Sequence, residues 1–297
     1  MIWIRRRRKI QDRCIEAVLF LAAASSIFVT LAIVYILVSE SLPFFKEVSL
    51  KEFLTGQEWT PLFANPSYGI RPLISGTLMT TIIALLVAIP LGTIAAAFLS
   101  EYVKPRLREI LKPLLELLAA VPTVVYGYFA LLFVTPILQK IFPSLSGFNV
   151  LSAGLVIGIM IVPYVSSLSE DAMRSVPIHL REASFALGSS RLQTVFRVVI
   201  PAAFSGMTSA YILAISRALG ETMVVAIAAG MQPNLTWNPL EPSETITAFI
   251  VQVSLGDLPH GSIGYRSIYV AGLTLLVITL SLNIFGVWLR KKYQEKE

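Results

Sequence analysis

Apolar residues in this chain form long, nearly continuous blocks, and the polar residues gather in the stretches between those blocks. Six blocks meet or nearly meet the ~20 apolar residues that a helix needs to cross the hydrocarbon core of a bilayer. The predicted spans cover residues 17–39, 73–99, 114–138, 151–168, 203–231 and 267–289. This pattern predicts an all-α, polytopic membrane protein with six transmembrane helices.

The first apolar block could also belong to a secretory signal peptide, because the basic run Arg5–Lys9 precedes it. A signal peptide has an apolar core of roughly 7–15 residues, followed by a cleavage site with small residues. The block at 17–39 is longer, and no such site follows it. We therefore expect an uncleaved first transmembrane helix at 17–39, after a basic N-terminal segment at 1–16.

Positive charges predict how these spans are oriented. Eighteen of the 24 lysines and arginines fall in loops and termini on one side, five fall on the other side, and Arg217 lies inside a span. Because cytoplasmic loops carry an excess of Lys and Arg, we expect both termini, including the tail 290–297, in the cytoplasm. The loop 177–201 is then cytoplasmic as well, and the long loop 40–72 is external.

The external loop 40–72 contains a signal for a short helix. Ser49 and Glu52 have the spacing of a helix N-terminal capping box. Two aromatic residues further on, Trp59 and Tyr68, are expected to anchor the loop at the membrane interface.

The last external loop, 232–266, also contains a helix signal. Apolar residues recur at i, i+3, i+4 and i+7 from Ile246, after Ser243 and Glu244, and Gly256 is placed to end the helix. The segment is too short to span a bilayer, so a short amphipathic helix is expected. Such a helix either covers the bundle or receives a partner from outside.

Composition narrows the possible functions. Only 14% of the 297 residues are charged, against about 25% in soluble domains. The net charge of +6 comes from short loops rather than a continuous stripe, so nucleic-acid binding is not expected. Cys14 is the only cysteine, and His179 and His260 are predicted on opposite sides, so neither a catalytic nor a metal constellation is expected. An intramembrane enzyme would need such a catalytic or metal-binding cluster. The sequence also lacks the GxxxxGK-Ser/Thr loop that binds ATP.

Arg217 and Glu221 are the sharpest candidate site, because both lie inside the predicted fifth span. Arg217 follows Pro201 by 16 residues, which is about 24 Å of helix and places it near the middle of the membrane. An ionised side chain there costs roughly 2.5–3.5 kcal/mol and usually faces a bundle interior or an aqueous path. The two residues form either a structural ion pair or a gate in which Arg217 binds an anion in one state and Glu221 in another.

The polar loop 177–201 predicts two short helices with a bend between them. Pro177 suits a first helical position, and Gly188 suits the left-handed residue that ends a helix. Ser190 begins a capping box, and Pro201 is expected to mark the next boundary. The helices are expected to project Ala183, Phe185 and Leu187 and to keep Arg181, Arg191 and Arg197 solvated. From these residues alone, the loop is either a helix lying on the bilayer or a docking element for a cytoplasmic partner.

The same loop resembles the “EAA…G…I-x-L-P” signature of ABC-importer permeases. Glu182, Gly188 and Pro201 stand at the spacing of that signature, while Ser184 takes the place of its second alanine. The resemblance implies the transmembrane domain of a type I ABC importer over 73–289, in which this loop is the coupling helix that docks in a groove of an ATPase subunit. The residues implied to make that contact are Glu182, Ala183, Ser184, Phe185, Leu187, Gly188 and Pro201.

The stretch SRALGET, residues 216–222, is similar to the fifth-span motif of phosphate-specific (Pst) permeases, and the segments WTPLFANPSYGIRPLISGTL and ELLAAVPTVVYGY look like their C-type subunit. This resemblance implies import of inorganic phosphate across the inner (plasma) membrane. ATP and Mg²⁺ would be bound by a separate ATPase, and no cofactor by this chain. The implied partners are an A-type permease, two ATPase subunits, an extracytoplasmic phosphate-binding protein and membrane lipid.

Two alternatives remain open. A sulfate, molybdate or tungstate permease is the alternative within the same class, since those permeases carry a related RALGE-type stretch. A carrier driven by an ion gradient is the alternative from another class. Such carriers often show internal repeats and helices broken at the membrane midplane, and both the uninterrupted fifth span predicted at 203–231 and the loop 177–201 argue against one.

Overall fold

The structure is a computed structural model that describes residues 2–256 and 258–294, which are helical apart from loops and one isolated antiparallel bridge. Met1 of the predicted N-terminal segment and residues 295–297 of the predicted tail lie outside the described residues. Within the described part, six helical segments are long and apolar enough to cross a membrane: Ile15–Glu47, Arg71–Glu101, Thr123–Ile141, Val150–Arg174, Arg191–Leu219 and Ile263–Lys292. The all-α, six-span architecture expected from the hydropathy pattern is confirmed.

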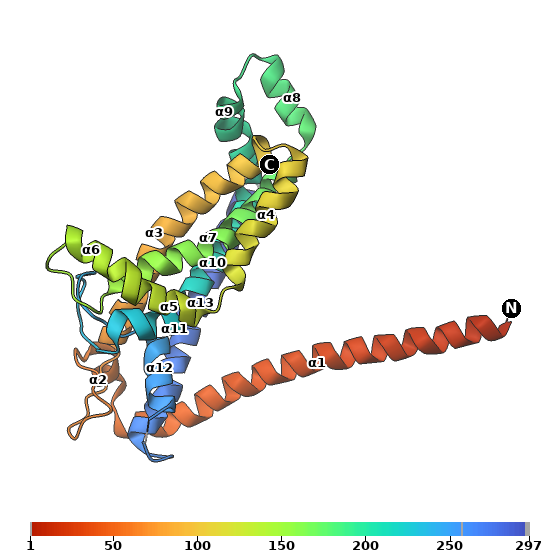
Figure 1. The fold of residues 1–297 in the computed structure, drawn as a ribbon. Coiled ribbons are helices and arrows are strands. Elements are labelled where there is room, and N and C mark those ends of the chain that lie inside the picture. The colour runs from red at the N-terminus through yellow and green to blue at the C-terminus, as the bar shows by residue number, and fades with distance from the viewer. Residues whose placement is uncertain (1, 257, 295–297) are drawn as a thin grey trace.

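Figure 1 shows the helices in chain order. The first elements are α1 (Ile2–Glu47), α2 (Leu50–Thr55), α3 (Arg71–Glu101), α4 (Pro105–Ala120), α5 (Thr123–Phe129), the π-helical turn η1 (Ala130–Val134) and α6 (Thr135–Ile141). They are followed by α7 (Val150–Arg174), α8 (Ile178–Ala186), α9 (Arg191–Thr194), the π-helical turn η2 (Val195–Val199) and α10 (Ile200–Leu219). The last elements are α11 (Met223–Val225), the π-helical turn η3 (Ala226–Gly230), α12 (Ile246–Ser254) and α13 (Ile263–Gln294).

Helices α3 and α7 form the centre of the bundle, and α10 packs against both of them. Two glycines of α7 allow its close approach to α3. A Cβ on Gly154 would lie 2.7 Å from the Cβ of Ile83, and a Cβ on Gly158 would lie 2.8 Å from the carbonyl oxygen of Ala84. Both distances are shorter than real Cβ contacts, so these glycines set the spacing between the two helices.

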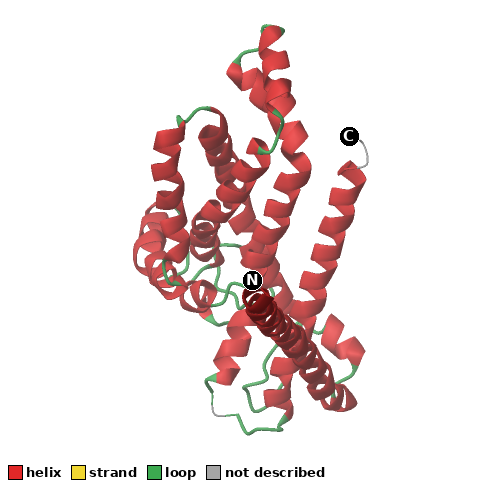
Figure 2. Cartoon of the chain, turned by 90° about the vertical axis from the view of Figure 1, so that its right-hand side faces the viewer, coloured by secondary structure: helices red, strands yellow, loops and turns green. Residues whose placement is uncertain are grey.

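Helix α1 projects away from the bundle, and its C-terminal part lies against α13 (Figures 1 and 2). It extends on both sides of the predicted first span, 17–39. Its apolar side chains are uncovered within the single chain, with Phe20 71% and Phe28 72% exposed. A surface this apolar needs lipid or a neighbouring chain around it.

The third predicted span, 114–138, is not one helix. Helix α4 ends at Ala120, Val121 has an extended backbone with φ −66° and ψ 131°, and α5 begins after Pro122. A proline disfavours helical backbone in the residue before it and donates no N–H of its own, which explains the break. The segment that can cross the membrane therefore begins at Thr123, and α4 lies against α7 as a separate helix.

Trp59 and Tyr68 are not interfacial anchors, because both are buried, with 1% and 5% of their surface exposed. The two residues form the isolated antiparallel bridge, and their rings pack edge-on in a cluster with Phe44, Phe53 and Phe249. The ring centroids of Trp59 and Phe249 are 5.0 Å apart. This aromatic cluster holds α1, α2 and α12 together.

The short helices predicted in loops 40–72 and 232–266 are both present. Helix α2 follows Ser49, whose hydroxyl accepts a hydrogen bond from the Glu52 N–H at 3.2 Å. Helix α12 follows Thr245, whose hydroxyl accepts the N–H of the third residue beyond it at 3.2 Å. The Ser49 signal therefore gave the correct start of α2, whereas α12 is capped by Thr245 and not by the predicted Ser243 or Glu244.

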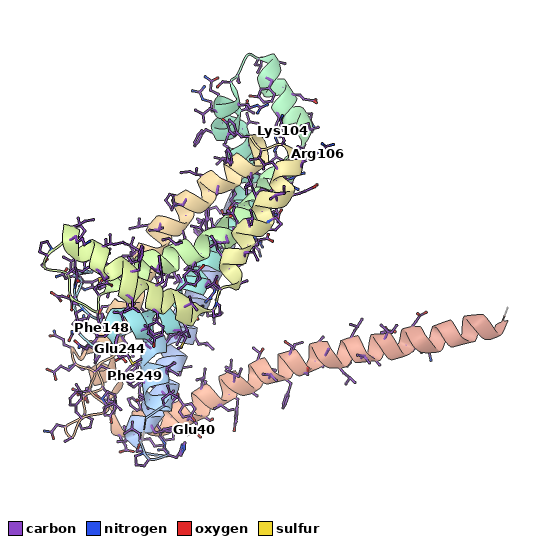
Figure 3. All side chains as sticks on the ribbon, viewed as in Figure 1. Glu40, Lys104, Arg106, Phe148, Glu244 and Phe249 are labelled. Carbon is purple, nitrogen blue, oxygen red and sulfur yellow. The ribbon has the colours of Figure 1, made fainter. Side chains whose placement is uncertain are left out.

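The two ends of the molecule carry different elements (Figure 3). The hairpin end carries α8 and α9, and Lys104 and Arg106 lie near it. The α12 end carries α2 and α12, with Glu244 and Phe249. The helices of the bundle connect the two ends.

Candidate functional site

Arg217 and Glu221 form an ion pair at the point where α10 ends. Arg217 Nη1 donates to Glu221 Oε2 at 2.9 Å, and Glu221 Oε1 accepts the Val224 N–H at 3.4 Å. Glu221 is buried, with 2% of its side chain exposed, whereas 35% of the Arg217 side chain is exposed. The two residues predicted as a pair are therefore paired in the structure, and their role in transport stays a prediction.

The fifth predicted span, 203–231, is broken at this ion pair. Helix α10 ends at Leu219 and α11 begins at Met223, so the residues between them leave the helix. The Thr247 hydroxyl of α12 donates to the carbonyl oxygen of Glu221 at 2.7 Å, which holds the broken segment in place. A side chain that caps the next helix competes with continued helical hydrogen bonding. The prediction of an uninterrupted fifth span is therefore wrong. The fifth span no longer argues against a carrier driven by an ion gradient.

The Arg217 guanidinium has hydrogen-bonding capacity to spare. Among the described residues, Glu221 is its one hydrogen-bond partner, while a guanidinium carries five N–H donors in a planar fork. A partly exposed fork can bind an oxyanion through two parallel hydrogen bonds, and a carboxylate beside it competes for the same donors. The geometry is suited to reversible anion binding.

Helices α8 and α9 form a hairpin, residues 177–201, that extends beyond the bundle (Figure 1). Gly188 lies between them with φ +81°, the left-handed conformation that its position predicts. The Ser190 hydroxyl accepts the Gln193 N–H at 3.3 Å, and Gln193 Oε1 accepts the Ser190 N–H at 2.8 Å. The predicted bend and capping box are both confirmed.

The hairpin exposes most of the residues that were implied to contact an ATPase. Leu187 at the bend is 88% exposed, and Phe185 is 45% exposed. Ser184 is buried instead, and its hydroxyl lies 2.9 Å from the Thr194 hydroxyl, which ties α8 to α9. The exposed members of the set are Glu182, Ala183, Phe185, Leu187, Gly188 and Pro201.

Pro201 is not the helix boundary that was expected. The helix continues from α9 through η2 into α10, which begins at Ile200. Proline has no N–H to donate, and a π-helical turn directly before it accommodates the missing helical hydrogen bond. The hairpin is therefore continuous with the helix that carries Arg217.

Arg181 is buried rather than solvated, with 11% of its side chain exposed. Its guanidinium donates to Glu101 at 2.9 Å, to the Met173 carbonyl oxygen at 2.7 Å and to the Val176 carbonyl oxygen at 2.6 Å. These acceptors compensate for the loss of water around the charge. Glu101 is 80 residues away in sequence, so no local pattern points to this contact, which joins α8 to the ends of α3 and α7.

A second cluster of charges, which the sequence pattern leaves unmarked, joins α4 to α7. Glu170 is fully buried, and its oxygens accept hydrogen bonds from Arg108 at 2.6 Å and Lys112 at 2.8 Å, with Arg174 3.7 Å away. Lys112 also lies 2.7 Å from Asp171. Burial lowers the pKa of Lys112, but its hydrogen bonds to Asp171 and Glu170 outweigh burial and raise that pKa above its ordinary value. This cluster fixes the charged side of α4 on the bundle.

The chain belongs to the family described as “Binding-protein-dependent transport system inner membrane component”, which matches residues 88–295. The match includes the hairpin and the Arg217–Glu221 pair. The family match and the six membrane-spanning helices make this chain an ABC-importer permease, a multi-pass inner-membrane protein that acts in transport. More particularly, the chain resembles the C-type membrane subunit of phosphate transport systems, and the resemblance noted in its sequence is confirmed.

Several curated relatives carry that similarity. The “Probable phosphate transport system permease protein PstC” of Methanocaldococcus jannaschii is 32% identical over 251 residues, 78% of each chain. The “Phosphate transport system permease protein PstC 1” of Mycobacterium tuberculosis is 34% identical over 267 residues, covering 78% of this chain and 79% of the relative. The “Probable ABC transporter permease protein YqgH” of Bacillus subtilis is 37% identical over 232 residues, covering 78% and 75%, and its name states no substrate.

Solved structures share the fold at low sequence identity. A bacterial ABC transporter that imports the polysaccharide alginate matches with a TM-score of 0.61 at 16% identity, over 88% of this chain and 92% of its own. An inward-facing MetNI methionine ABC transporter matches with a TM-score of 0.55 at 14% identity, over 76% and 94%. These similarities establish the type I importer fold.

Proposed function

We propose that this chain is the membrane subunit through which an ATP-driven importer moves inorganic phosphate by alternating access. One observation carries the proposal: a partly exposed arginine fork, Arg217, paired with the buried carboxylate of Glu221 at the break in the fifth span. The names of the relatives, several of them phosphate permeases, support phosphate as the transported anion. Broken helices near a substrate site are common in transporters, since unwound backbone is tolerated where it lines a cavity.

In the proposed cycle, phosphate takes N–H donors of Arg217 that Glu221 otherwise uses. Phosphate and carboxylate oxygens accept the same two-pronged hydrogen bonds, so the two anions compete for one fork. When phosphate leaves, Glu221 pairs with Arg217 again, and no buried charge stays unpaired. An equivalent arginine from an A-type permease would give two positive charges that converge on a divalent anion.

The hairpin is the proposed site of coupling to ATP hydrolysis. The exposed Leu187 and Phe185 would fill a groove of a cytoplasmic ATPase subunit. Motion of that subunit would reach the Arg217 site through the continuous helix from α9 to α10. The ion pair between Arg181 and Glu101 would pass the same motion to α3.

The proposed assembly contains this chain, an A-type permease, two ATPase subunits that bind ATP and Mg²⁺, and an external phosphate-binding protein. In this arrangement both termini and the hairpin face the cytoplasm, and the α12 end faces outward. The uncovered apolar surface of α1 suits contact with the second permease and with lipid.

Transport by the assembled complex in proteoliposomes tests the proposal. We expect phosphate to stimulate ATP turnover and uptake, and we expect a large excess of sulfate or molybdate to leave both unchanged. Stimulation by sulfate, molybdate or tungstate in place of phosphate would assign another oxyanion to the same permease. Uptake that needs an ion gradient and no ATP would contradict the proposed importer.

A further inference from the structure

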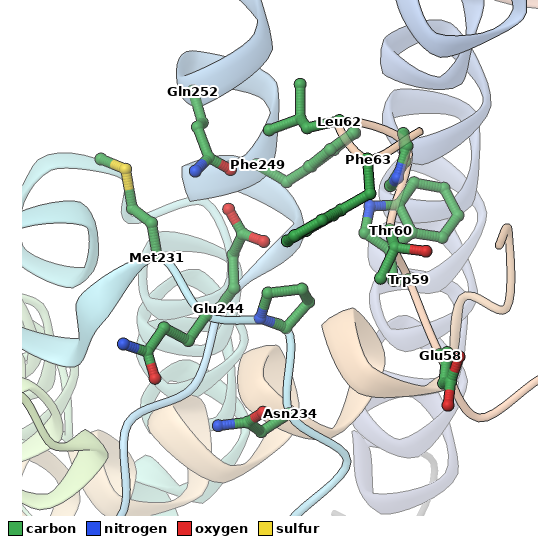
Figure 4. A pocket seen from close by; sticks show the side chains of 13 residues that line it. Glu58, Trp59, Thr60, Leu62, Phe63, Met231, Asn234, Glu244, Phe249 and Gln252 are labelled. Atoms are coloured by element: carbon green, nitrogen blue, oxygen red, sulfur yellow. The ribbon is translucent and has the colours of Figure 1, made fainter. Parts of the chain in front are cut away.

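A pocket lies at the α12 end, and neither Arg217 nor Glu221 is among its lining residues. It has a volume of about 500 Å³ and is lined by the loop after α2, the segment after η3, and α12 (Figure 4). Aromatic, thioether and polar side chains share its walls, among them Trp59, Phe63, Met231, Glu244, Phe249 and Gln252. A pocket with apolar walls and a few polar groups has the character of a binding site for a small group.

Glu244 presents a buried carboxyl in the wall of this pocket. It is 1% exposed, and its Oε1 has no partner among the described residues. The indole Nε1 of Trp59, in the same wall, also lacks a partner there. An unpaired buried acceptor and an unpaired buried donor are both costly, and together they point to a ligand that supplies one donor and one acceptor.

The protein holds Glu244 firmly at this position. A Cβ on Gly76 of α3 would lie within van der Waals overlap of the Glu244 carbonyl oxygen, so only glycine allows this close approach. Two residues further on, the Ile246 N–H donates to the Thr77 hydroxyl at 3.0 Å. Backbone contacts therefore place the Glu244 carboxyl, and no ion pair with a described residue does so.

The charge of the pocket limits what it binds. Of the described residues that line it, Glu58 and Glu244 are the titratable ones, and none is a lysine, arginine or histidine. With its carboxyls ionised, such a pocket repels phosphate and attracts a cation. Aromatic faces also favour cations, because the ring faces carry negative charge density. The pocket is thus chemically opposite to the proposed anion site at Arg217.

We propose that this pocket binds a primary ammonium group carried on an apolar stem, as in a lysine side chain. The ammonium would donate to Glu244, the stem would pack against Phe63 and Phe249, and an oxygen next to the stem would accept the Trp59 N–H. The ligand is either a free amine or a lysine of a protein that docks at the α12 end. The inference goes beyond phosphate transport and does not depend on the identity of the transported anion.

A matched pair of ligands tests the site on the purified full-length chain in its assembled complex. The probes are Nα-acetyl-lysine amide and Nα-acetyl-norleucine amide. They share an apolar stem and carbonyl oxygens, and only the lysine probe carries a side-chain ammonium. Ligand-observed NMR titration is expected to show binding of the lysine probe and about tenfold weaker binding of the norleucine probe. Equal affinity of the two probes would overturn the proposal.

Glu244→Gln keeps the shape of the side chain and removes its charge. It is expected to weaken the lysine probe about tenfold and to leave the norleucine probe unchanged. Glu241→Gln is the matched control, because Glu241 is exposed, is bonded to Thr236 and Asn238, and does not line the pocket. Thermal unfolding establishes that both variants are folded, and unchanged lysine affinity in folded Glu244→Gln would overturn the proposal.

The pH dependence gives a signature that a structural role of Glu244 would not produce. Burial raises the pKa of Glu244 to about 8, so its carboxyl must lose a proton before it attracts an ammonium. Affinity for the lysine probe is expected to rise by up to about tenfold per pH unit from pH 6 toward 8 and to fall above roughly pH 10.4, where the ammonium itself titrates. In Glu244→Gln the rise should be absent, and a rise that persists there would contradict the assignment.

A second arm distinguishes the two sources of the ammonium. Docking of the external binding protein is measured on complexes with Glu244→Gln or Glu241→Gln, with the lysine probe as competitor. Docking that weakens in Glu244→Gln alone and is displaced by the probe assigns a lysine of that protein. Docking that is unchanged while the probe still binds the wild-type complex assigns a free amine.

Discussion

Arg217 is the residue on which the proposed transport step depends, because its guanidinium offers more donors than Glu221 uses. Arg217→Lys keeps the charge and loses the planar fork, and we expect it to lower initial phosphate uptake by about tenfold or more. Glu221→Gln should lower uptake too, since a neutral amide competes poorly with phosphate for the fork and phosphate release is therefore slower. Radiolabelled phosphate uptake into proteoliposomes measures both effects.

Arg13→Lys is the control for these variants, since Arg13 is exposed on α1 and lies outside both the hairpin and the proposed anion path. It should transport phosphate normally. Near-normal uptake in both Arg217→Lys and Glu221→Gln would exclude the gate and leave the pair a structural ion pair.

Glu244 is expected to reduce stability at neutral pH. Burial raises its pKa from 4.5 to about 8, so the folded protein favours the protonated carboxyl. Its contribution to stability is fully present below pH 4.5 and is lost as the pH rises through 8. Glu244→Gln, which does not titrate, should therefore gain up to about 3 kcal/mol relative to the wild type at pH 7 and little at pH 4.

Thermal unfolding at the two pH values measures this difference. The carboxyl of Glu241 provides a contrast of opposite sign, because hydrogen bonds from Thr236 and Asn238 lower its pKa. Glu241→Gln should therefore show no gain at pH 7. A gain in Glu244→Gln that is the same at both pH values would show that the buried carboxyl does not titrate as expected.

At the scale of the elements, the contact between α8 and α3 determines whether the hairpin is held in place. Arg181→Met removes a guanidinium with three acceptors and leaves Glu101 with 10% exposure and no partner charge. Breaking a buried ion pair in this way costs about 3 kcal/mol. We expect the variant to insert in the membrane and to co-purify with less ATPase.

Arg13→Met is the matched control, because Arg13 is exposed on α1, outside the hairpin. It should retain the ATPase. If Arg181→Met retained ATPase binding and phosphate-stimulated ATP turnover at wild-type levels, the ion pair would have no part in coupling.

Helix boundaries show where local sequence is a sufficient guide. Ser49, Gly188 and Ser190 act through the residues next to them, so their capping and bending roles were predictable from spacing. The breaks at Pro122 and after Leu219 were missed, because the apolar content of each block continues across the break. Hydropathy reports whether a segment is apolar and not whether its backbone stays helical.

At the scale of the whole molecule, the orientation in the membrane is open to direct test. Cysteines are introduced at two exposed leucines at opposite ends, Leu187 in the hairpin (88% exposed) and Leu255 after α12 (82% exposed), in a Cys14→Ser background. The positive-inside pattern predicts that an impermeant maleimide labels Leu255→Cys from outside intact cells and labels Leu187→Cys only after the membrane is opened. Labelling of Leu187→Cys in intact cells would place the hairpin outside and contradict the coupling proposal.

By itself, the sequence determined the class of this protein: six membrane-spanning segments, a capped and bent hairpin, and an arginine beside a glutamate in the fifth apolar block. These features depend on composition and on residues within about one helical turn of each other, where short-range sterics and hydrogen bonding dominate. Only the tertiary structure decided that Arg181 forms an ion pair with Glu101 and that Glu170 forms ion pairs with basic residues of α4. It also decided that Glu244 and Trp59 line one pocket. Such contacts join residues far apart in the chain, and their energy exists only after the helices have packed.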